Sequence, residues 1–189
     1  MAIITLNNRS INRSDTASAD QVWTATSATA SDFQAGGGIT ETDQWRLTAN
    51  HSGVGTITAN WERNDTTGFG LLGTGMSESS GIFTFPSTGY WFVIFKSMLN
   101  SSAASLYVRG GIEYTPDNGT YSIVANDYGQ CYAASSYGGT NSSFLFDITD
   151  LTNHKVRFAL GQNHGGTPQF FGNTDINKTY ATFTRLGDT

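Results

Sequence analysis

The sequence predicts an all-β jelly-roll sandwich of about ten strands behind an extended N-terminal arm. From about residue 43, segments rich in β-branched and aromatic residues follow one another, many with alternating polarity. Turn residues separate these segments about every ten residues, the spacing of a β-sandwich. Helical periodicity is absent, and Ser, Thr, Asn and Gly supply about two fifths of the 189 residues, a composition that favours strands and turns.

Composition excludes several classes of partner. The formal net charge is −5 and only 13% of the residues are charged, so we expect no basic face for nucleic acid. The apolar run at residues 2–4 is too short for a signal peptide or a membrane span. Cys131 is the only cysteine, which rules out an intramolecular disulfide and fits a small apolar strand residue. We therefore expect no nucleic acid, membrane or cofactor partner.

The chain divides at the glycines near residue 38. Residues 1–38 combine a short strand-like segment, residues 3–6, with an Ala-, Ser- and Thr-rich stretch of linker composition at residues 15–38. Residues 39–189 form the predicted jelly-roll domain. The arm is expected to touch a neighbour through a few apolar anchors, namely Ile3, Ile4, Leu6, Val22 and Trp23.

The body strands are predicted in order from their patterns. Residues 55–64 alternate, with Ile57, Ala59 and Trp61 on one face. The expected strands are residues 44–50, 55–64, 82–85, 90–95, 104–115, 120–133 (in two pieces), 142–149, 154–161 and 179–186.

The segment GIFTFPSTGYWFVIFK, residues 81–96, is unusually apolar for this chain. Residues 90–95 form an unbroken run of aromatic and β-branched side chains after the turn at residues 86–89. In a strand with one face in solvent, apolar and polar residues alternate. A strand that is apolar throughout therefore needs cover on both faces. That cover can come from a second sheet of the same chain or from another chain.

Catalytic and metal-binding motifs are weak. GFGLLG, residues 68–73, has dinucleotide-like glycine spacing, but no strand–turn–helix context follows, so loop glycines are the better interpretation. The histidines His51, His154 and His164 are scattered without metal-ligand spacing. Asp147 and Asp150 could bind calcium, but turn capping is the favoured interpretation. We predict no catalytic residue and no metal site, and therefore no enzyme.

Two aromatic patches are candidates for contacts. One patch consists of Tyr128, Tyr132 and Tyr137 with the loop at residues 135–143, and it could stack on a glycan or dock a protein. The favoured interpretation is that these tyrosines are incidental aromatic residues of a glycine-rich loop. Phe170 and Phe171 are expected to close one end of the barrel or a subunit junction.

The segment at 81–96 resembles the signature of the tumour necrosis factor and complement-globular-head superfamily. Residues 144–161 resemble the penultimate hairpin of that family, and residues 179–189 resemble its closing strand. The resemblance spans roughly residues 44–189 and implies a ten-strand jelly roll assembled as a tight homotrimer. The signature positions that match are Gly81, Phe83, Pro86, Gly89, Tyr90, Trp91 and Phe95, and the residues expected in the trimer or its core are Phe83, Tyr90, Trp91, Phe92, Phe95 and Phe183.

The polar arm and the Ser-, Thr-, Asn- and Gly-rich body look more like those of bacteriophage virion proteins with this domain than like animal cytokines. We therefore predict a trimeric decoration or cement protein that stabilises a phage head shell, with the major capsid protein or another virion protein as its partner. Such a protein would be made in the host cytoplasm and carried on the particle surface. The alternative is the glycan-binding, receptor-binding tip of a tail fibre.

Overall fold

The computed structural model describes residues 4–6, 9–11, 21–25, 31–35, 38–163 and 165–189, with side chains from residue 38 onward. Two compact units are present, residues 1–38 and residues 39–189. In the first unit, β1 (Ile4–Leu6) pairs with β2 (Arg9–Ile11), and β3 (Gln21–Ala25) pairs with β4 (Ser31–Ala35), both antiparallel. The predicted linker at residues 15–38 thus contains a hairpin, since Val, Trp and Thr in QVWTA favour a strand.

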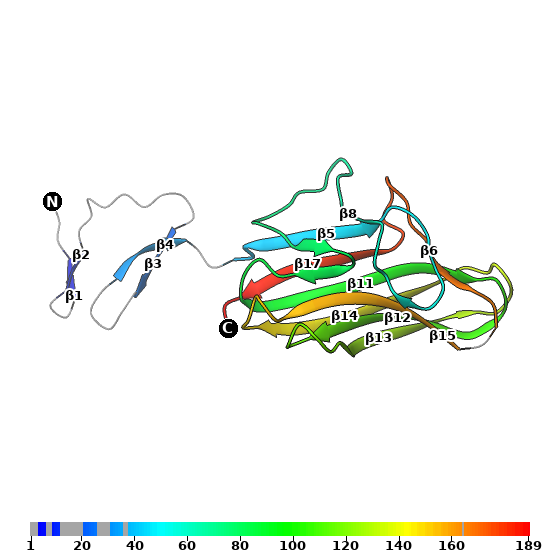
Figure 1. Ribbon diagram of the computed structural model, residues 1–189. Helices are drawn as coiled ribbons and strands as arrows, with labels where there is room; N and C mark the ends of the chain where they lie inside the picture. The colour runs from blue at the N-terminus through cyan, green and yellow to red at the C-terminus, as the bar shows by residue number, and fades with distance from the viewer. Residues whose placement is uncertain (1–3, 7–8, 12–20, 26–30, 36–37, 164) are drawn as a thin grey trace. The chain divides into compact units, whose positions relative to one another are not determined.

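The second unit is a sandwich of two antiparallel sheets, which confirms the predicted all-β jelly roll (Figure 1). We name each sheet after its central strand. The β11 sheet holds β5 (Glu41–Leu47), β6 (His51–Ser52), β8 (Trp61–Arg63), β11 (Gly89–Ser101), β14 (Gly138–Ile148), β16 (Pro168–Phe170) and β17 (Tyr180–Gly187). The β12 sheet holds β7 (Gly55–Thr56), β9 (Ser77–Ser79), β10 (Ile82–Thr84), β12 (Ser105–Thr115), β13 (Ser122–Cys131) and β15 (Lys155–Asn163).

The strand β11 is the longest in the described chain, at 13 residues. It pairs with β14 on one side, from Gly89 opposite Ile148 to Leu99 opposite Gly138. On its other side it pairs first with β17 and then, near its end, with β16. Figure 1 shows β11 in green between β14 and the red β17. The apolar run at residues 90–95 therefore lies at the centre of one sheet.

Aromatic rings fill the space between the sheets. Phe83 lies at the centre of this cluster, fully buried, with its ring centroid 5.2 Å from that of Trp61 and 5.3 Å from that of Phe183. Phe158 joins it at 5.4 Å and stacks on Phe95 at 4.6 Å. Ring pairs at these separations add stability beyond the area that they bury.

A second part of the interior is built from hydroxyl groups. Ser97 on β11 and Thr140 on β14 are buried, and their hydroxyl oxygens lie 2.6 Å apart. Ser142, also buried, donates to the carbonyl oxygen of Gly110 on β12 at 2.6 Å. A Cβ at residue 110 would overlap the Thr140 hydroxyl, so only glycine fits. These bonds satisfy polar groups that would otherwise destabilise a buried site.

Several predicted strands differ from the structure. The segment at 55–64 is interrupted between β7 and β8, where Asn60 has φ 64°, a left-handed conformation that breaks a strand. Ile57 and Trp61 are buried, but Ala59, which was predicted on the same face, is exposed. The two pieces predicted within 120–133 form the single strand β13. The strand β16, with buried Phe170, was not predicted as a strand.

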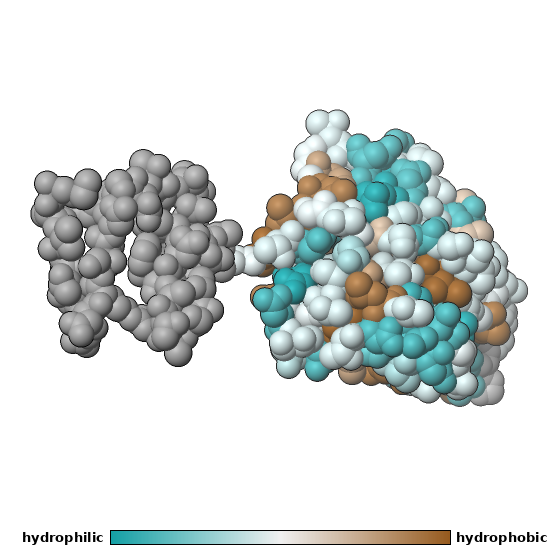
Figure 2. All heavy atoms as spheres, turned by 60° about the vertical axis from the view of Figure 1, so that its left-hand side comes forward, coloured by the Kyte–Doolittle hydropathy of each residue, from teal (hydrophilic) through white to brown (hydrophobic). Residues whose placement is uncertain are grey.

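Among the described residues, no helix has the length and apolar character needed to cross a membrane. Figure 2 shows one face of residues 39–189 as a mosaic of hydrophilic and hydrophobic patches rather than one continuous apolar surface.

Candidate functional site

The candidate site is the outer face of the β11 sheet. Side chains on a strand alternate between the two faces of its sheet, and in β11 Trp91, Val93 and Phe95 point inward with no exposed area. Tyr90 and Phe92 point outward: Tyr90 is 41% exposed and Phe92 is half-buried. The second sheet therefore covers one apolar face of this strand, and the described residues cover the other only in part.

The neighbouring strands extend this outer surface. Leu145 on β14 is the register partner of Phe92 and is 52% exposed. On the other side of β11, Thr184 is opposite Phe92 and Thr182 is opposite half-buried Ile94. We call Tyr90, Phe92, Ile94 and Leu145 the β11 face. It is an apolar strip along β11 and β14, bordered by threonine hydroxyls on β17.

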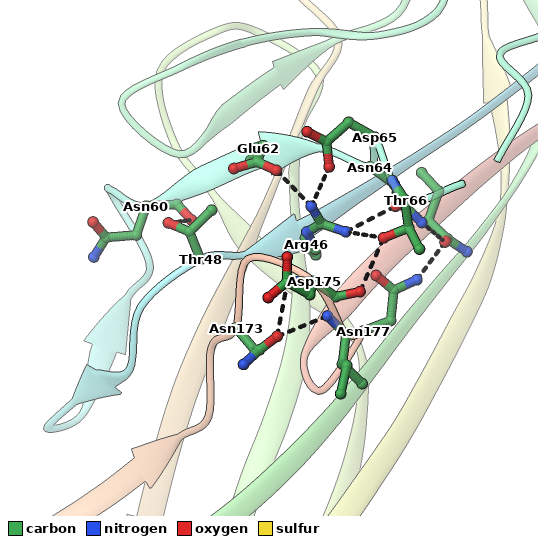
Figure 3. Close-up of polar contacts among 12 residues, drawn as sticks. Arg46, Thr48, Asn60, Glu62, Asn64, Asp65, Thr66, Asn173, Asp175 and Asn177 are labelled. Carbon is green, nitrogen blue, oxygen red and sulfur yellow. Dashed lines mark hydrogen bonds and ion pairs between the residues drawn. The ribbon is translucent and has the colours of Figure 1, made fainter. Parts of the chain in front are cut away.

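A buried arginine marks where this open surface ends. Arg46 on β5 has no exposed area and donates to Glu62 at 2.6 Å, to Asn64 at 2.9 Å, and also to Asp65 (Figure 3). Its Nη1 also donates to the Thr66 hydroxyl at 2.5 Å, and that hydroxyl in turn donates to the carbonyl oxygen of residue 175 at 3.0 Å. Segments from residues 64–66 and 173–177 thus meet over β5. Sequence analysis missed Arg46, because its partners lie up to 20 positions away and are ordinary polar residues.

The residues predicted for the trimer or core separate into two groups. Four of them, Phe83, Trp91, Phe95 and Phe183, lie between the sheets with no exposed area. Only Tyr90 and Phe92 are on the β11 face, so only these two can contact another chain without unfolding.

The predicted arm anchors cannot be placed in contacts. Ile3 lies outside the described residues. Ile4 and Leu6 belong to β1, and Val22 and Trp23 belong to β3, while the described side chains begin beyond them. The role of the arm stays a prediction.

The structure does not gather the three predicted ligand tyrosines into one loop. Tyr128 is inside β13, and its ring meets Tyr107 of β12 at 4.8 Å. Tyr137 precedes β14 and meets half-buried Phe171 at 5.5 Å. Tyr132, 80% exposed, has no aromatic partner among the described residues. The predicted loop at 135–143 was wrong from residue 138 onward, because pairing with β11 extends β14 through those polar residues.

Of the two acidic residues considered for calcium, Asp147 lies on β14 opposite Tyr90, and Asp150 follows that strand. Asp150 accepts hydrogen bonds from the backbone N–H groups of Thr152 and Asn153, and from the Asn153 amide at 2.7 Å. These hydrogen bonds lower the pKa of Asp150, and the bond from the Asn153 side chain contributes most. Its carboxylate caps the turn between β14 and β15, as the favoured interpretation predicted. Within the described ranges, no group of three His, Cys, Asp or Glu residues could hold a metal ion.

The histidines that the structure describes are also separate. His51 lies on β6 and His154 just before β15, where its ring is 5.5 Å from that of Tyr114. Burial lowers the pKa of His51. His164 lies outside the described residues.

The strand order can be compared with known folds once these sheets are defined. Each sheet has five principal strands, in the orders β14-β11-β17-β5-β8 and β13-β12-β15-β10-β9. A crystal structure of murine APRIL at pH 5.0 is similar, with a TM-score of 0.57 and 12% identity over 77% of this chain and 98% of that one. The structure of Eiger TNF from S. frugiperda is similar too, with a TM-score of 0.60 and 10% identity over 79% and 94%. The chain has a TNF-like jelly-roll fold.

These similarities concern the fold. A second murine APRIL structure, at pH 8.5, gives a TM-score of 0.55 at 11% identity. No protein-family model matches the chain, and no curated protein sequence matches it either.

Proposed function

We propose that this protein is a non-enzymatic structural module that assembles as a homotrimer through the β11 face and decorates the head of a bacteriophage. The observation that carries the assembly is the partly uncovered apolar strip at Tyr90, Phe92, Ile94 and Leu145. Exposed apolar side chains that lie together on a sheet commonly mark a protein interface. The occupant of this face is a second copy of the same chain.

The strip is too small to be the whole interface. A stable contact between two proteins covers about 800 Å² on each partner, more than four partly covered side chains can supply. The contact must therefore extend over the threonines of β17 and the exposed side chains of β14. Three equivalent copies related by a threefold axis would close such a head-to-tail contact into a ring.

The capsid assignment rests on sequence character. The polar arm and the Ser-, Thr-, Asn- and Gly-rich body resemble virion proteins. A trimer carries three identical arms, so weak contacts of each arm with the shell would act together and give avidity that one copy lacks.

Assembly is tested by measuring mass in solution. The trimer should have a mass of about 61 kDa by light scattering, three times the 20.3 kDa of one chain. Leu145→Arg should give monomers, because a cation would be buried against the neighbouring copy. Leu106→Arg is the matched control, since Leu106 is also exposed but lies on β12. A wild-type monomer at micromolar concentration, or trimers from both variants, would contradict assembly through this face.

The capsid role is tested on particles. Phage lacking this protein should adsorb normally to host cells but lose infectivity faster on heating, and added trimer should restore heat resistance. Normal heat resistance with lost adsorption would instead indicate the tail-fibre alternative.

A further inference from the structure

A hollow of about 330 Å³ lies on the outer face of the β12 sheet, opposite the side that packs on the core. Two small residues of β15, Ala159 and Gly161, lie in its lining. Gly111 on β12 is the register partner of Ala159 on β15, and Gly161 on β15 is the partner of Arg109. Larger side chains surround this floor, because Tyr107, Arg109 and Glu113 alternate with Gly111 along the same face of β12. Its volume is in the range of small-molecule sites.

The guanidinium of Arg109 lies over the floor of this hollow. A Cβ built on Gly161 would come within 2.7 Å of Arg109 Nε and 2.9 Å of its Cζ, so the group rests directly on the backbone of β15. Arg109 Nε is buried and has no hydrogen-bond partner, and the described residues supply no carboxylate to Arg109. The guanidinium carries further N–H groups on its two Nη atoms, and these are the groups that can donate to a planar anion in the hollow.

The neighbouring acid is already paired. Glu113 Oε2 accepts a 2.6 Å bond from Arg157 Nε, and the Arg157 guanidinium lies 3.8 Å from the centre of the Tyr121 ring. This pairing neutralises the far end of the hollow. One uncompensated positive charge, at Arg109, remains for a ligand.

An aromatic pair borders the hollow: Tyr107 lines it, and Tyr128 packs on Tyr107 outside the lining. Tyr128 on β13 is the register partner of Arg109, and the Tyr128 ring meets the Tyr107 ring at 4.8 Å and an interplanar angle of 82°. Tyr128 is 54% exposed. The apolar C–H face of a sugar ring can pack on such a partly exposed ring, while phenol and carboxylate groups exchange hydrogen bonds with its hydroxyls.

We propose that this hollow binds a saccharide bearing a single carboxylate. The guanidinium of Arg109 would hold the carboxylate by two parallel hydrogen bonds, and the sugar ring would lie against Tyr128 above the small-residue floor. A polyanion is disfavoured, because the hollow has one free cation and a lining acid, Glu113, in a protein of net charge −5. This site goes beyond the proposed structural role and lies on the other sheet from the β11 face.

The test titrates the full-length protein with glucuronate, using calorimetry and ligand-observed NMR, with glucose, acetate and sulfate as comparison ligands. Glucuronate should bind in the millimolar range or tighter and at least about tenfold more tightly than glucose, the difference expected from one charge-assisted pair. Arg109→Gln should reduce glucuronate binding to the level of glucose. Lys178→Gln is the charge-matched control and should bind as the wild type does.

Two further variants test the geometry. Gly161→Ala should reduce binding as strongly as Arg109→Gln, because the new methyl group displaces the guanidinium while residue 161 keeps an unstrained φ. Tyr128→Ala should weaken binding, whereas Tyr132→Ala, which removes a more exposed tyrosine without a ring partner, should not. Thermal melting and mass of each variant establish that the fold and assembly are intact.

Several results would overturn the proposal. Absence of glucuronate binding would do so, as would equal affinity for glucose. Acetate or sulfate binding as tightly as glucuronate would show a simple anion site without saccharide recognition. Unchanged binding by Arg109→Gln and Gly161→Ala would place the ligand elsewhere. None of these outcomes depends on whether Leu145→Arg disrupts the trimer.

Discussion

Replacing Phe83 with Ala tests whether the aromatic cluster holds the two sheets together. Phe83 has no exposed area, and its ring contacts those of Trp45, Trp61, Phe158 and Phe183 at centroid distances of 5.2 to 5.6 Å. Loss of a buried Phe side chain costs about 3–5 kcal/mol of unfolding free energy. Because four ring pairs are lost together, we expect a value near the upper end, about 5 kcal/mol.

The matched control is Phe92→Ala, which removes the same atoms from the outer face. Phe92 is only half-buried in one chain, so the cost to folding of that chain should be about 1–2 kcal/mol. In a trimer, Phe92→Ala should also weaken association, and this part of the stability loss should be small at low protein concentration and grow to a limit as the concentration rises. The Phe83→Ala loss should not depend on concentration.

Denaturant titrations at several protein concentrations measure both quantities. A loss of about 5 kcal/mol corresponds to a melting temperature lower by about 10–20 °C in a protein of this size. If Phe83→Ala does not fold, Phe83→Leu gives a smaller loss of the same origin. A Phe83→Ala cost below about 1 kcal/mol, or one equal to that of Phe92→Ala, would refute the packing argument.

Three further residues and the arm give independent tests. Gly81→Ala should destabilise by several kcal/mol, because Gly81 has φ +80° and a Cβ would overlap the Ile57 carbonyl; an unchanged melting temperature would contradict the turn geometry. Arg46→Met should lower the unfolding free energy by about 2–3 kcal/mol. This is less than for a fully buried ion pair, because its two acidic partners, Glu62 and Asp65, are not fully buried. An unchanged unfolding free energy would mean that apolar packing replaces the network. Burial lowers the pKa of His51 in the folded state, so the unfolded chain binds more protons and the unfolding free energy should fall as the pH drops below about 6.5. His51→Gln should remove that fall, and an identical pH profile would exclude this origin. Deletion of residues 1–38 should leave the melting temperature of the body nearly unchanged but abolish particle binding, whereas failure to fold would make the arm part of the core.

The parts of the fold that sequence could predict are those with a strong local pattern. β11, β15 and β17 have dense apolar or alternating residues; β11 contains its predicted segment, and β15 and β17 contain all but the first residue of theirs. The first four residues of β14 could not be predicted, because residues 138–141 are small or polar and become a strand only by pairing with β11. The break at Asn60 was missed for a similar reason: a local alternation cannot reveal a left-handed residue.

The candidate site was predictable only in outline. An apolar strand with too many large residues indicated that β11 needs cover on both faces, and the structure assigns Trp91 to the inside and Phe92 to the outside. The hollow over β12 was invisible in the sequence. Its lining needs Arg109 on β12 opposite Gly161 on β15, and that register between distant segments is set by the sheet.

The buried hydroxyl groups bear on how β14 finds its correct alignment during folding. Apolar residues at its C-terminal end, such as Phe146 and Ile148, distinguish the two faces there. In the polar half, a shift by one residue would exchange Thr140 and Ser142 for Asn141 and Ser143, with little change in hydrophobicity. Only the correct alignment lets Thr140 meet Ser97 and lets Ser142 reach Gly110. Folding of this strand is therefore expected to begin at its apolar end, with directional hydrogen bonds rejecting misaligned pairings as the polar half closes.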